Sequence, residues 1–143
     1  MMYILYLIRG LPGSGKSTLG KTLLSYSLNH HGDADMFEAD DYFMDKGEYK
    51  FDRRSLPIAH EYCLSRAYDA MWRGKGDVIV SNTFSMNWEM EQYRMAAEVH
   101  DYKLFVIECQ NSFGSTHDVP DESIQSMRDR WESNEDWEEK DHA

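Results

Sequence analysis

The sequence predicts a single three-layer α/β domain, in which helices cover both faces of a mainly parallel sheet of about four or five strands. Apolar runs alternate with segments in which apolar residues recur at helical spacing, which is typical of strands joined by crossover helices. The run Val78–Val80 is apolar at consecutive positions, as expected of a strand covered on both faces. No internal repeat, linker or low-complexity segment divides the chain, so we expect one domain over residues 1–143.

The first half of the chain is expected to contain two strands and one helix. The apolar segment Tyr3–Ile8 runs directly into a glycine-rich loop, and we interpret it as a buried strand rather than a signal peptide. A helix is expected from Lys16 to about Asn29, because apolar residues recur there at helical spacing. A short second strand is expected at Met36–Ala39, with the acidic pair Asp40–Asp41 at its carboxyl end.

The second half of the chain continues the alternation. Apolar stripes mark its helices, and glycines close the first of them. The expected elements are a helix at Ser55–Arg73, a strand at Asp77–Ser81, a helix at Asn87–His100, a strand at Lys103–Glu108, an irregular stretch at Asn111–Val119 and a last helix that opens at Pro120 and turns Ile124, Met127 and Trp131 inward. Residues 131–143 are acidic and are expected to form a solvated helix end and a frayed tail.

The charge, hydropathy and cysteine content of the chain indicate which partners and which cellular compartment to expect. The net charge of −11 opposes binding to a long nucleic-acid duplex, but it permits a strand end to enter a locally basic pocket. No apolar run approaches the ~20 residues of a membrane span, so we expect no membrane partner. The two cysteines lie far apart and suit a reducing compartment, and we therefore expect a cytoplasmic protein.

One segment carries recognisable chemistry: Gly10-Leu-Pro-Gly-Ser-Gly-Lys16-Ser17 is the full P-loop signature, placed between an expected strand and an expected helix. Its glycines let successive backbone N–H groups point at phosphate oxygens, and the positive end of the helix adds a favourable field. Lys16 is expected to reach the β- and γ-phosphates of ATP, and the Ser17 hydroxyl to ligate Mg²⁺. The residues predicted to hold the nucleotide are Gly13, Ser14, Gly15, Lys16, Ser17 and Thr18.

The pair Asp40–Asp41 is the second candidate for a catalytic role. Ligands of parallel α/β sheets bind beyond the carboxyl ends of the strands, which places both carboxylates near the triphosphate. One of them could accept a proton from an attacking hydroxyl, or hold the water shell of Mg²⁺. Because side chains alternate along a strand, we expect the two to point to opposite faces, so that only one acts. The alternative is that the pair caps the turn that follows.

Several segments together resemble a known family: Ile8–Thr18, Asp40-Asp-Tyr-Phe43, Ala59-His60 with Cys63, Val78–Thr83 and His117–Pro120. They are similar to the polynucleotide 5′-hydroxyl kinase branch of the P-loop kinases, which includes small ATP-binding kinase-like proteins, many of them encoded by bacteriophages. The resemblance implies an ATP-dependent kinase, located in the host cytoplasm if a phage encodes it. Unlike the family, this chain is expected to have a shortened lid, because the segment after the Lys103–Glu108 strand is several residues shorter. It also implies that Asp40 is the general base.

The acceptor side departs from that family. Phe43 stands where the family has an arginine that grips the acceptor phosphate, and Asn82-Thr83 stands where it has Asp-Thr. Phe43 is therefore expected either to stack on a base of the acceptor or to join the core. The candidate acceptor-binding residues are Asp41, Phe43, Asn82 and Thr83.

The lid arginine of the family is also missing. Gln110 stands near its expected position, and no Lys or Arg occurs between Lys103 and Arg128. An arginine over the γ-phosphate can be worth ~10³-fold in rate. We expect Arg128 or Arg130 of the last helix to contact the phosphates instead, with Arg53 and Arg54 as alternatives, unless these arginines only pair with surface acids.

The favoured function is transfer of the γ-phosphate of ATP to a hydroxyl acceptor, either a nucleic-acid 5′ end or a nucleoside-like molecule. Two alternatives stay open. The chain could be an ATPase or nucleotide-binding module whose acceptor site has decayed. It could also be an acidic interaction protein that uses a bound nucleotide for folding and docks on a host protein or another partner.

Overall fold

Four parallel strands form the central sheet in the order β2–β5–β1–β6. These strands are β1 (Ile4–Gly10), β2 (Ala34–Phe37), β5 (Asp77–Ser81) and β6 (Lys103–Cys109). The computed structural model describes residues 2–112, 119–135 and 137. The parallel α/β sheet confirms the predicted fold class, and β5 has the predicted bounds.

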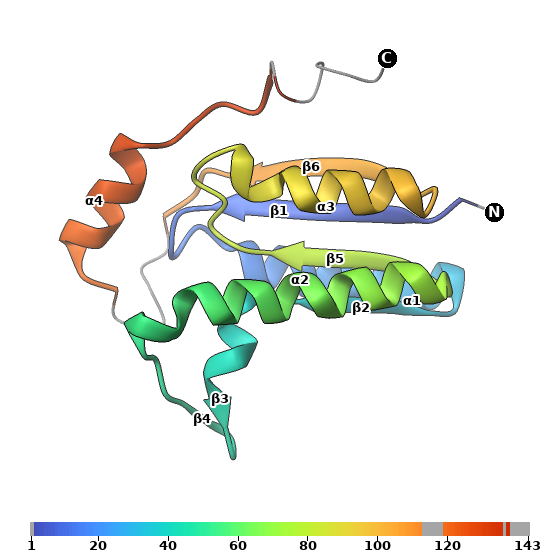
Figure 1. Ribbon diagram of the computed structural model, residues 1–143, viewed down its shortest axis with the longest axis horizontal. Coiled ribbons are helices and arrows are strands. Elements are labelled where there is room, and N and C mark those ends of the chain that lie inside the picture. Colours follow the sequence, from blue (N-terminus) through green and yellow to red (C-terminus); the bar gives the residue numbers. More distant parts are fainter. Residues whose placement is uncertain (1, 113–118, 136, 138–143) are drawn as a thin grey trace.

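Helices cover both faces of the sheet, as the three-layer prediction requires (Figure 1). α1 (Lys16–His31) packs on one face, against β5 and β2. α2 (Leu56–Arg73) and α3 (Trp88–Val99) lie beside each other on the opposite face. The residues that α2 buries are mostly small, which lets this helix approach the sheet closely: Ala59, Cys63, Ala67, Ala70 and Met71.

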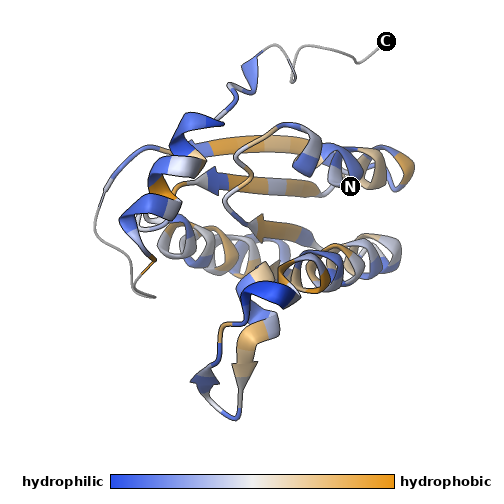
Figure 2. Ribbon diagram, turned by 60° about the vertical axis from the view of Figure 1, so that its left-hand side comes forward, coloured by the Kyte–Doolittle hydropathy of each residue, from blue (hydrophilic) through white to orange (hydrophobic). Residues whose placement is uncertain are grey.

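The parallel register aligns the carboxyl ends of three strands. Ile8 of β1 pairs with Ser81 of β5 and with Ile107 of β6, and Gly10 pairs with Cys109. The loops that follow these strands therefore meet at one edge of the sheet, where ligands of parallel α/β folds bind. In Figure 2 the strands are largely hydrophobic, whereas α4 (Asp121–Asp129), which lies beyond this edge, is mostly hydrophilic.

The segment after β2 differs from the prediction. β2 ends at Phe37 rather than at residue 39, and Asp40 and Asp41 lie in a 3-10 helix, η1 (Ala39–Phe43). The expectation that strand alternation turns the two carboxylates to opposite faces is therefore wrong. The Asp41 carboxylate instead accepts a hydrogen bond from the backbone N–H of Glu38, at 3.0 Å, so a local polar contact at the helix start orients it.

A small hairpin follows η1 that the sequence pattern does not predict. Its strands are β3 (Met44–Asp45) and β4 (Glu48–Tyr49), and it projects away from the sheet (Figure 1). The two residues of its turn, Lys46 and Gly47, have φ angles of 51° and 85°, which suits a tight turn between twisted strands. Strands of two residues are too short to show periodicity. A second 3-10 helix, η2 (Arg53–Ser55), then leads into α2.

The last helix opens directly after Pro120, as predicted, and half-buries Ile124 and Met127. Trp131 lies beyond the end of that helix. Part of the predicted irregular stretch, including His117, lies outside the described residues. The expectation of a frayed tail is wrong at Trp137, which is buried: its indole N–H donates to Glu91 at 2.7 Å.

A buried carboxylate secures the opposite edge of the sheet. Asp77, the first residue of β5, accepts hydrogen bonds from the backbone N–H of Ile4 at 2.9 Å, the Ser27 hydroxyl at 2.8 Å and the His31 imidazole at 2.8 Å. Its three partners come from β1 and α1, so this carboxylate ties the layers together away from the P-loop. Buried carboxylates are tolerated when they are hydrogen-bonded in this way.

Candidate functional site

The P-loop connects the end of β1 to the start of α1, as predicted. A Cβ atom at Gly10 would collide with the Ser14 side chain and would lie 2.9 Å from the carbonyl oxygen of Cys109. Gly15, at the N-cap of α1, has a φ angle of 92° and offers no side-chain cap to the helix. The first backbone N–H groups of α1 are therefore left to an anion bound at the loop.

Two side chains of the loop fit a phosphate ligand. The Ser14 hydroxyl is buried and has no hydrogen-bond partner among the described residues. Lys16 donates from Nζ to the carbonyl oxygen of Leu11 at 3.2 Å. Burial lowers the pKa of Lys16 below its ordinary value, although the charges of Glu38 and Asp40 act in the opposite direction. A buried hydroxyl without a partner and a desolvated ammonium both favour a polyanion here.

Glu38 joins the site, although the sequence analysis did not single it out. The Ser17 hydroxyl donates to Oε1 of Glu38 at 2.5 Å. Burial raises the pKa of Glu38, and the charges of Asp41 and Asp40 add to that effect, while the Ser17 hydrogen bond opposes it. The signal that could have revealed this residue is its place directly after β2, at the sheet edge that the P-loop also occupies.

Asp40 and Asp41 have different surroundings. Asp41 is engaged by the fold, because it accepts from the Glu38 backbone and from Nη1 of Arg66 at 3.2 Å. This contact matches the alternative in which the pair caps a turn. The Asp40 carboxylate instead accepts from the Tyr49 hydroxyl at 3.2 Å and acts electrostatically on Lys16. Of the two carboxylates, Asp40 is therefore the one whose charge acts on the pKa of Lys16.

The predicted acceptor residues are only partly brought together. Phe43 is 4% exposed and packs in the core, so of its two expected roles the structure favours the core and not base stacking. Asn82 is buried and holds η1 to the end of β5: its side-chain oxygen accepts from the Ala39 backbone at 2.8 Å. Thr83 contacts the P-loop through its backbone, since its carbonyl oxygen accepts from the Gly10 N–H at 3.2 Å.

The two candidate phosphate-contacting arginines have protein partners. Arg128 donates to the Gln125 side chain at 3.2 Å on the surface of α4. Arg130 donates from Nε to the Ser85 hydroxyl at 3.0 Å. Since Ser85 lies in the loop after β5, Arg130 is held at the edge of the sheet where the P-loop lies, whereas the contact of Arg128 stays within its own helix.

Arg9 is a fully buried cation beside the P-loop that sequence reasoning missed. Its guanidinium donates to the Phe84 carbonyl at 2.6 and 3.0 Å and to the Asn134 side chain at 2.8 Å. The guanidinium carbon also lies 4.2 Å from the ring centre of Trp131. Arg9 thus fixes the segment after α4 to the strand that leads into the P-loop. Its partners are 75 or more residues away in sequence, so no local pattern reveals it.

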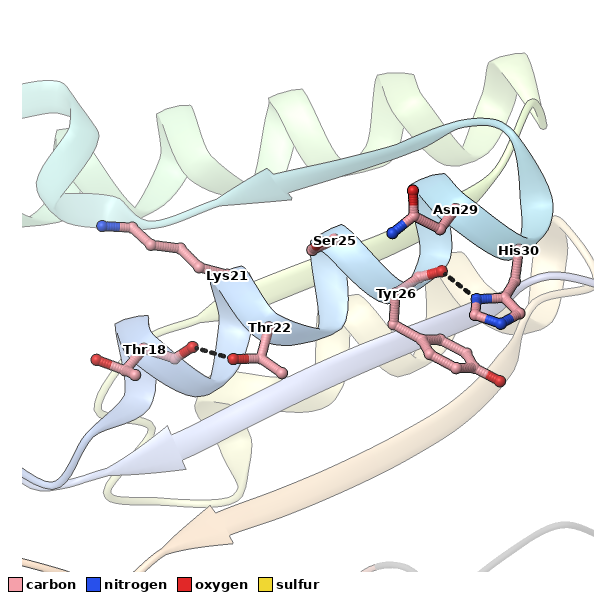
Figure 3. Close-up of a pocket in the computed structure, with 7 residues that line it drawn as sticks. All are labelled: Thr18, Lys21, Thr22, Ser25, Tyr26, Asn29 and His30. Carbon is pink, nitrogen blue, oxygen red and sulfur yellow. Dashed lines mark hydrogen bonds between the residues drawn. The ribbon is translucent and has the colours of Figure 1, made fainter.

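An open hollow lies elsewhere, along α1 (Figure 3). This open hollow of about 570 Å³ shares only Thr18 with the predicted nucleotide-binding residues. Its lining is otherwise Lys21, Thr22, Ser25, Tyr26, Asn29 and His30. We therefore do not assign the nucleotide to it, because the loop N–H groups and Lys16 mark the phosphate position.

In the part of the chain that the structure describes, no three His, Cys, Asp or Glu side chains gather into a group that could hold a metal ion. The described helices include none that is both long and apolar enough to cross a bilayer.

Comparison with known proteins identifies the family. A family model described as "AAA domain" matches residues 5–115, well over half of the chain. NEDD4-binding protein 2 of Homo sapiens is 39% identical over 101 residues, which cover 71% of this chain. The aligned part is only 6% of the length of that relative.

Solved structures share the fold. Kti12 of Chaetomium thermophilum in complex with ADP-AlF3 matches with a TM-score of 0.65 and 14% identity, over 93% of this chain and 82% of that chain. A gluconokinase from Sinorhizobium meliloti 1021 matches with a TM-score of 0.61 and 14% identity, over 94% of this chain and 79% of that chain. At such identities the likeness concerns the fold alone. The fold is that of P-loop kinase-like proteins, and because the family model covers most of the chain, the protein belongs to the AAA domain family.

Proposed function

We propose that the protein is an ATP-dependent kinase that transfers the γ-phosphate to a hydroxyl acceptor, either a nucleic-acid 5′ end or a nucleoside-like molecule. One observation carries this proposal. Two carboxylates that follow β2 have different partners: Glu38 accepts a hydrogen bond from the Ser17 hydroxyl of the P-loop, and Asp40 accepts one from the Tyr49 hydroxyl. Two carboxylates with distinct environments can divide a metal role and a proton role between them.

Mg²⁺ fits this site. Hydroxyl and carboxylate oxygens are the ligands that Mg²⁺ prefers, and it is commonly held by one or two side chains together with substrate phosphates. In this proposal Ser17 supplies the hydroxyl, and Glu38, which accepts its hydrogen bond, supplies the carboxylate next to it. We therefore assign to Glu38 the metal role that the sequence suggested for Asp40. When bound, the ion would neutralise charge on the β- and γ-phosphates.

Asp40 is then the proposed general base. As the acceptor oxygen forms a bond to the γ-phosphorus, the hydroxyl proton passes to the Asp40 carboxylate. The bond between that phosphorus and the β–γ bridging oxygen breaks, and ADP leaves with the bond's electron pair. Lys16 stabilises the charge on the phosphates during transfer, and the α1 N-terminus adds a fixed favourable field.

A second candidate function is ATP hydrolysis without a macromolecular acceptor. Two expected acceptor residues favour it, because Phe43 is buried in the core and Asn82 is occupied in holding η1. In that case water would take the place of the acceptor hydroxyl, with Asp40 in the same role.

A transfer assay separates the two candidates. The protein is incubated with Mg²⁺ and ATP labelled in the γ-phosphate, in the presence of a 5′-hydroxyl oligonucleotide, a nucleoside, or neither. The proposed kinase is expected to label an acceptor, and Asp40→Asn is expected to lose that labelling. Release of free phosphate with no labelled acceptor would instead establish the ATPase. No turnover of ATP under any of these conditions would contradict both functions.

A further inference from the structure

α3 carries a second apolar stripe besides the one that it buries. Its core side consists of Met90, Tyr93, Ala96 and Ala97. On its outer side lie Trp88, Met95 and Val99, which are 70%, 56% and 70% exposed. With Gln92 included, the outer positions are 88, 92, 95 and 99. Their intervals of four, three and four residues are those of positions that face another helix. Large apolar residues on this spacing are not needed for the fold, since they face away from the sheet.

The neighbouring helix completes an apolar groove. A groove of about 410 Å³ lies between α2 and α3 and is lined by Leu64, Ser65, Tyr68, Gln92, Met95, Ala96 and Val99. The two helices run side by side over this face of the sheet (Figure 1). Tyr68 is nearly half exposed, and Trp72, one turn further along α2, is largely exposed. The stripe on α3 spans 12 residues, Trp88–Val99, so the stripe and the groove together would accommodate about three turns of a partner helix.

Acidic residues neighbour the groove residues along both helices. Glu61 lies three and four residues before Leu64 and Ser65 of α2, Asp69 directly follows Tyr68, and Glu98 lies between Met95 and Val99 of α3. Asp69 is paired with Arg73 at 3.2 Å, whereas Glu61 and Glu98 are exposed and have no ion-pair partner in the described part of the chain. An apolar groove with free carboxylates at its rim is complementary to a helix with basic flanks.

We propose that the groove between α2 and α3 is a docking site for an amphipathic helix of another protein, which places apolar side chains in the groove and Lys or Arg beside them. A second copy of this chain fits poorly. A two-fold contact through α3 would place the acidic rim against its own copy, and each chain has a net charge of −11. The inference does not depend on the proposed function, because no groove residue belongs to the phosphate site.

The test uses the full chain and a synthetic 18-residue peptide with amidated and acetylated ends. Its leucines follow a four–three spacing, and its other positions are Lys or Arg. One control peptide has the same composition in scrambled order. In a second control peptide, Glu replaces every Lys and Arg. Calorimetry is expected to show saturable binding of the first peptide, one per chain, with affinity at least about tenfold above both controls, as apolar fit and charge complementarity require.

Variants locate the binding. Met95→Lys and the milder Val99→Ser are each expected to lower the affinity for the basic peptide by about tenfold or more, as substitutions of central interface residues do. Glu98→Lys is expected to lower this affinity less, and to make the affinity depend less on salt concentration. Tyr26→Lys is the matched control, because Tyr26 is also half exposed but lies on α1, across the sheet. Thermal melts confirm that each variant is folded.

Three results would overturn the proposal. The first is equal binding of the ordered and scrambled peptides. The second is binding of the basic peptide that Met95→Lys and Val99→Ser, both folded, leave unchanged. The third is a wild-type dimer in sedimentation that Met95→Lys converts to a monomer, since the occupant of the groove would then be a second copy of this chain.

Discussion

The Ser17 hydroxyl donates a hydrogen bond to the Glu38 carboxylate, and the two oxygens lie 2.5 Å apart. Ser17 is the P-loop residue proposed to ligate Mg²⁺, so this contact brings a half-buried carboxylate to the proposed metal position. Burial raises the pKa of Glu38, and the charges of Asp41 and Asp40 act in the same direction. Glu38 therefore bears its charge at an energetic cost, which a divalent cation would offset.

The first prediction concerns stability without metal. Since the folded-state pKa of Glu38 is raised, this residue stabilises the fold below its unfolded pKa, and that contribution is lost as the pH rises through the folded-state pKa. Glu38→Gln is therefore expected to raise the melting temperature at pH 7 in EDTA by about 2–4 °C, with the gain vanishing below about pH 4. Glu98→Gln, at an exposed carboxylate, serves as the control and is expected to shift little. A lower melting temperature for Glu38→Gln at pH 7 would contradict the argument.

The second prediction concerns the requirement for Mg²⁺. If Ser17 and Glu38 hold the ion, Ser17→Ala and Glu38→Gln should each raise the Mg²⁺ concentration for half-maximal ATP turnover by about 10–100-fold, as loss of groups at a metal site typically does. Asp40→Asn is the comparison, and its residual turnover is expected to keep the wild-type Mg²⁺ dependence. The reverse pattern would return the metal role to Asp40.

The third prediction concerns the P-loop lysine. The Lys16 ammonium donates a hydrogen bond to the Leu11 carbonyl oxygen, and burial lowers the pKa of this lysine. Lys16→Ala is therefore expected to abolish tight triphosphate binding, measured by calorimetry, and to leave the melting temperature of the nucleotide-free protein unchanged or slightly raised. Unchanged triphosphate affinity would falsify the P-loop assignment.

How far the sequence predicts this site depends on the range of the contacts involved. The P-loop follows from residues adjacent in sequence, and strand β5 follows from a continuous apolar run. The start of α1 at Lys16 and both bounds of β5 are therefore predicted correctly, whereas β1 ends at Gly10, two residues later than expected. Glu38 is missed because its partner Ser17 lies 21 residues away. Arg9 is missed for the same reason, since it binds the carbonyl of Phe84.

The secondary structure of the segment from Glu38 to Tyr49 is predicted wrongly for a different reason. Its 3-10 helix and two-residue strands are too short for a periodic pattern, and polar contacts decide their geometry. The assumption that Asp40 and Asp41 belong to a strand therefore misplaces them, and the choice of Asp40 by family resemblance stays a prediction. Phe43, an aromatic residue in a loop-like sequence, becomes core because the hairpin folds its aromatic residues onto it.

The fourth prediction separates the two aspartates. Asp41 receives the Glu38 N–H and pairs with Arg66, so Asp41→Asn is expected to lower stability by about 1 kcal/mol, the usual effect of losing a helix-start contact and a half-exposed ion pair. Asp40→Asn is expected to leave stability within about 0.5 kcal/mol, as for most partly exposed substitutions, and to lose most phosphoryl transfer. Urea titration and the labelled-phosphate assay measure the two effects. If Asp41→Asn alone lost activity while keeping its stability, the base would be Asp41.

The fifth prediction concerns the acceptor. Tyr49, whose hydroxyl donates to Asp40, stacks with Phe51 at an interplanar angle of 15° and a centroid distance of 6.4 Å. Phe51 is 52% exposed, so it presents an aromatic surface one ring away from the proposed base. It can therefore take the stacking role that buried Phe43 cannot. Phe51→Ala is expected to raise KM for a 5′-hydroxyl oligonucleotide about tenfold, within the ~1–3 kcal/mol that stacking on one base contributes.

The control for Phe51→Ala is Phe105→Ala, because Phe105 is 50% exposed but belongs to β6, where its ring contacts Tyr6. We expect that variant to leave KM for the oligonucleotide unchanged, and both variants to keep KM for ATP. A stacking site without a phosphate grip also predicts that a nucleoside and its 3′-phosphate accept the γ-phosphate equally well. A preference above about tenfold for the 3′-phosphate, ~1.4 kcal/mol, would show that a cation such as Arg53 grips that phosphate instead. Equal KM values of the wild type and Phe51→Ala for the oligonucleotide would show that Phe51 does not bind the acceptor.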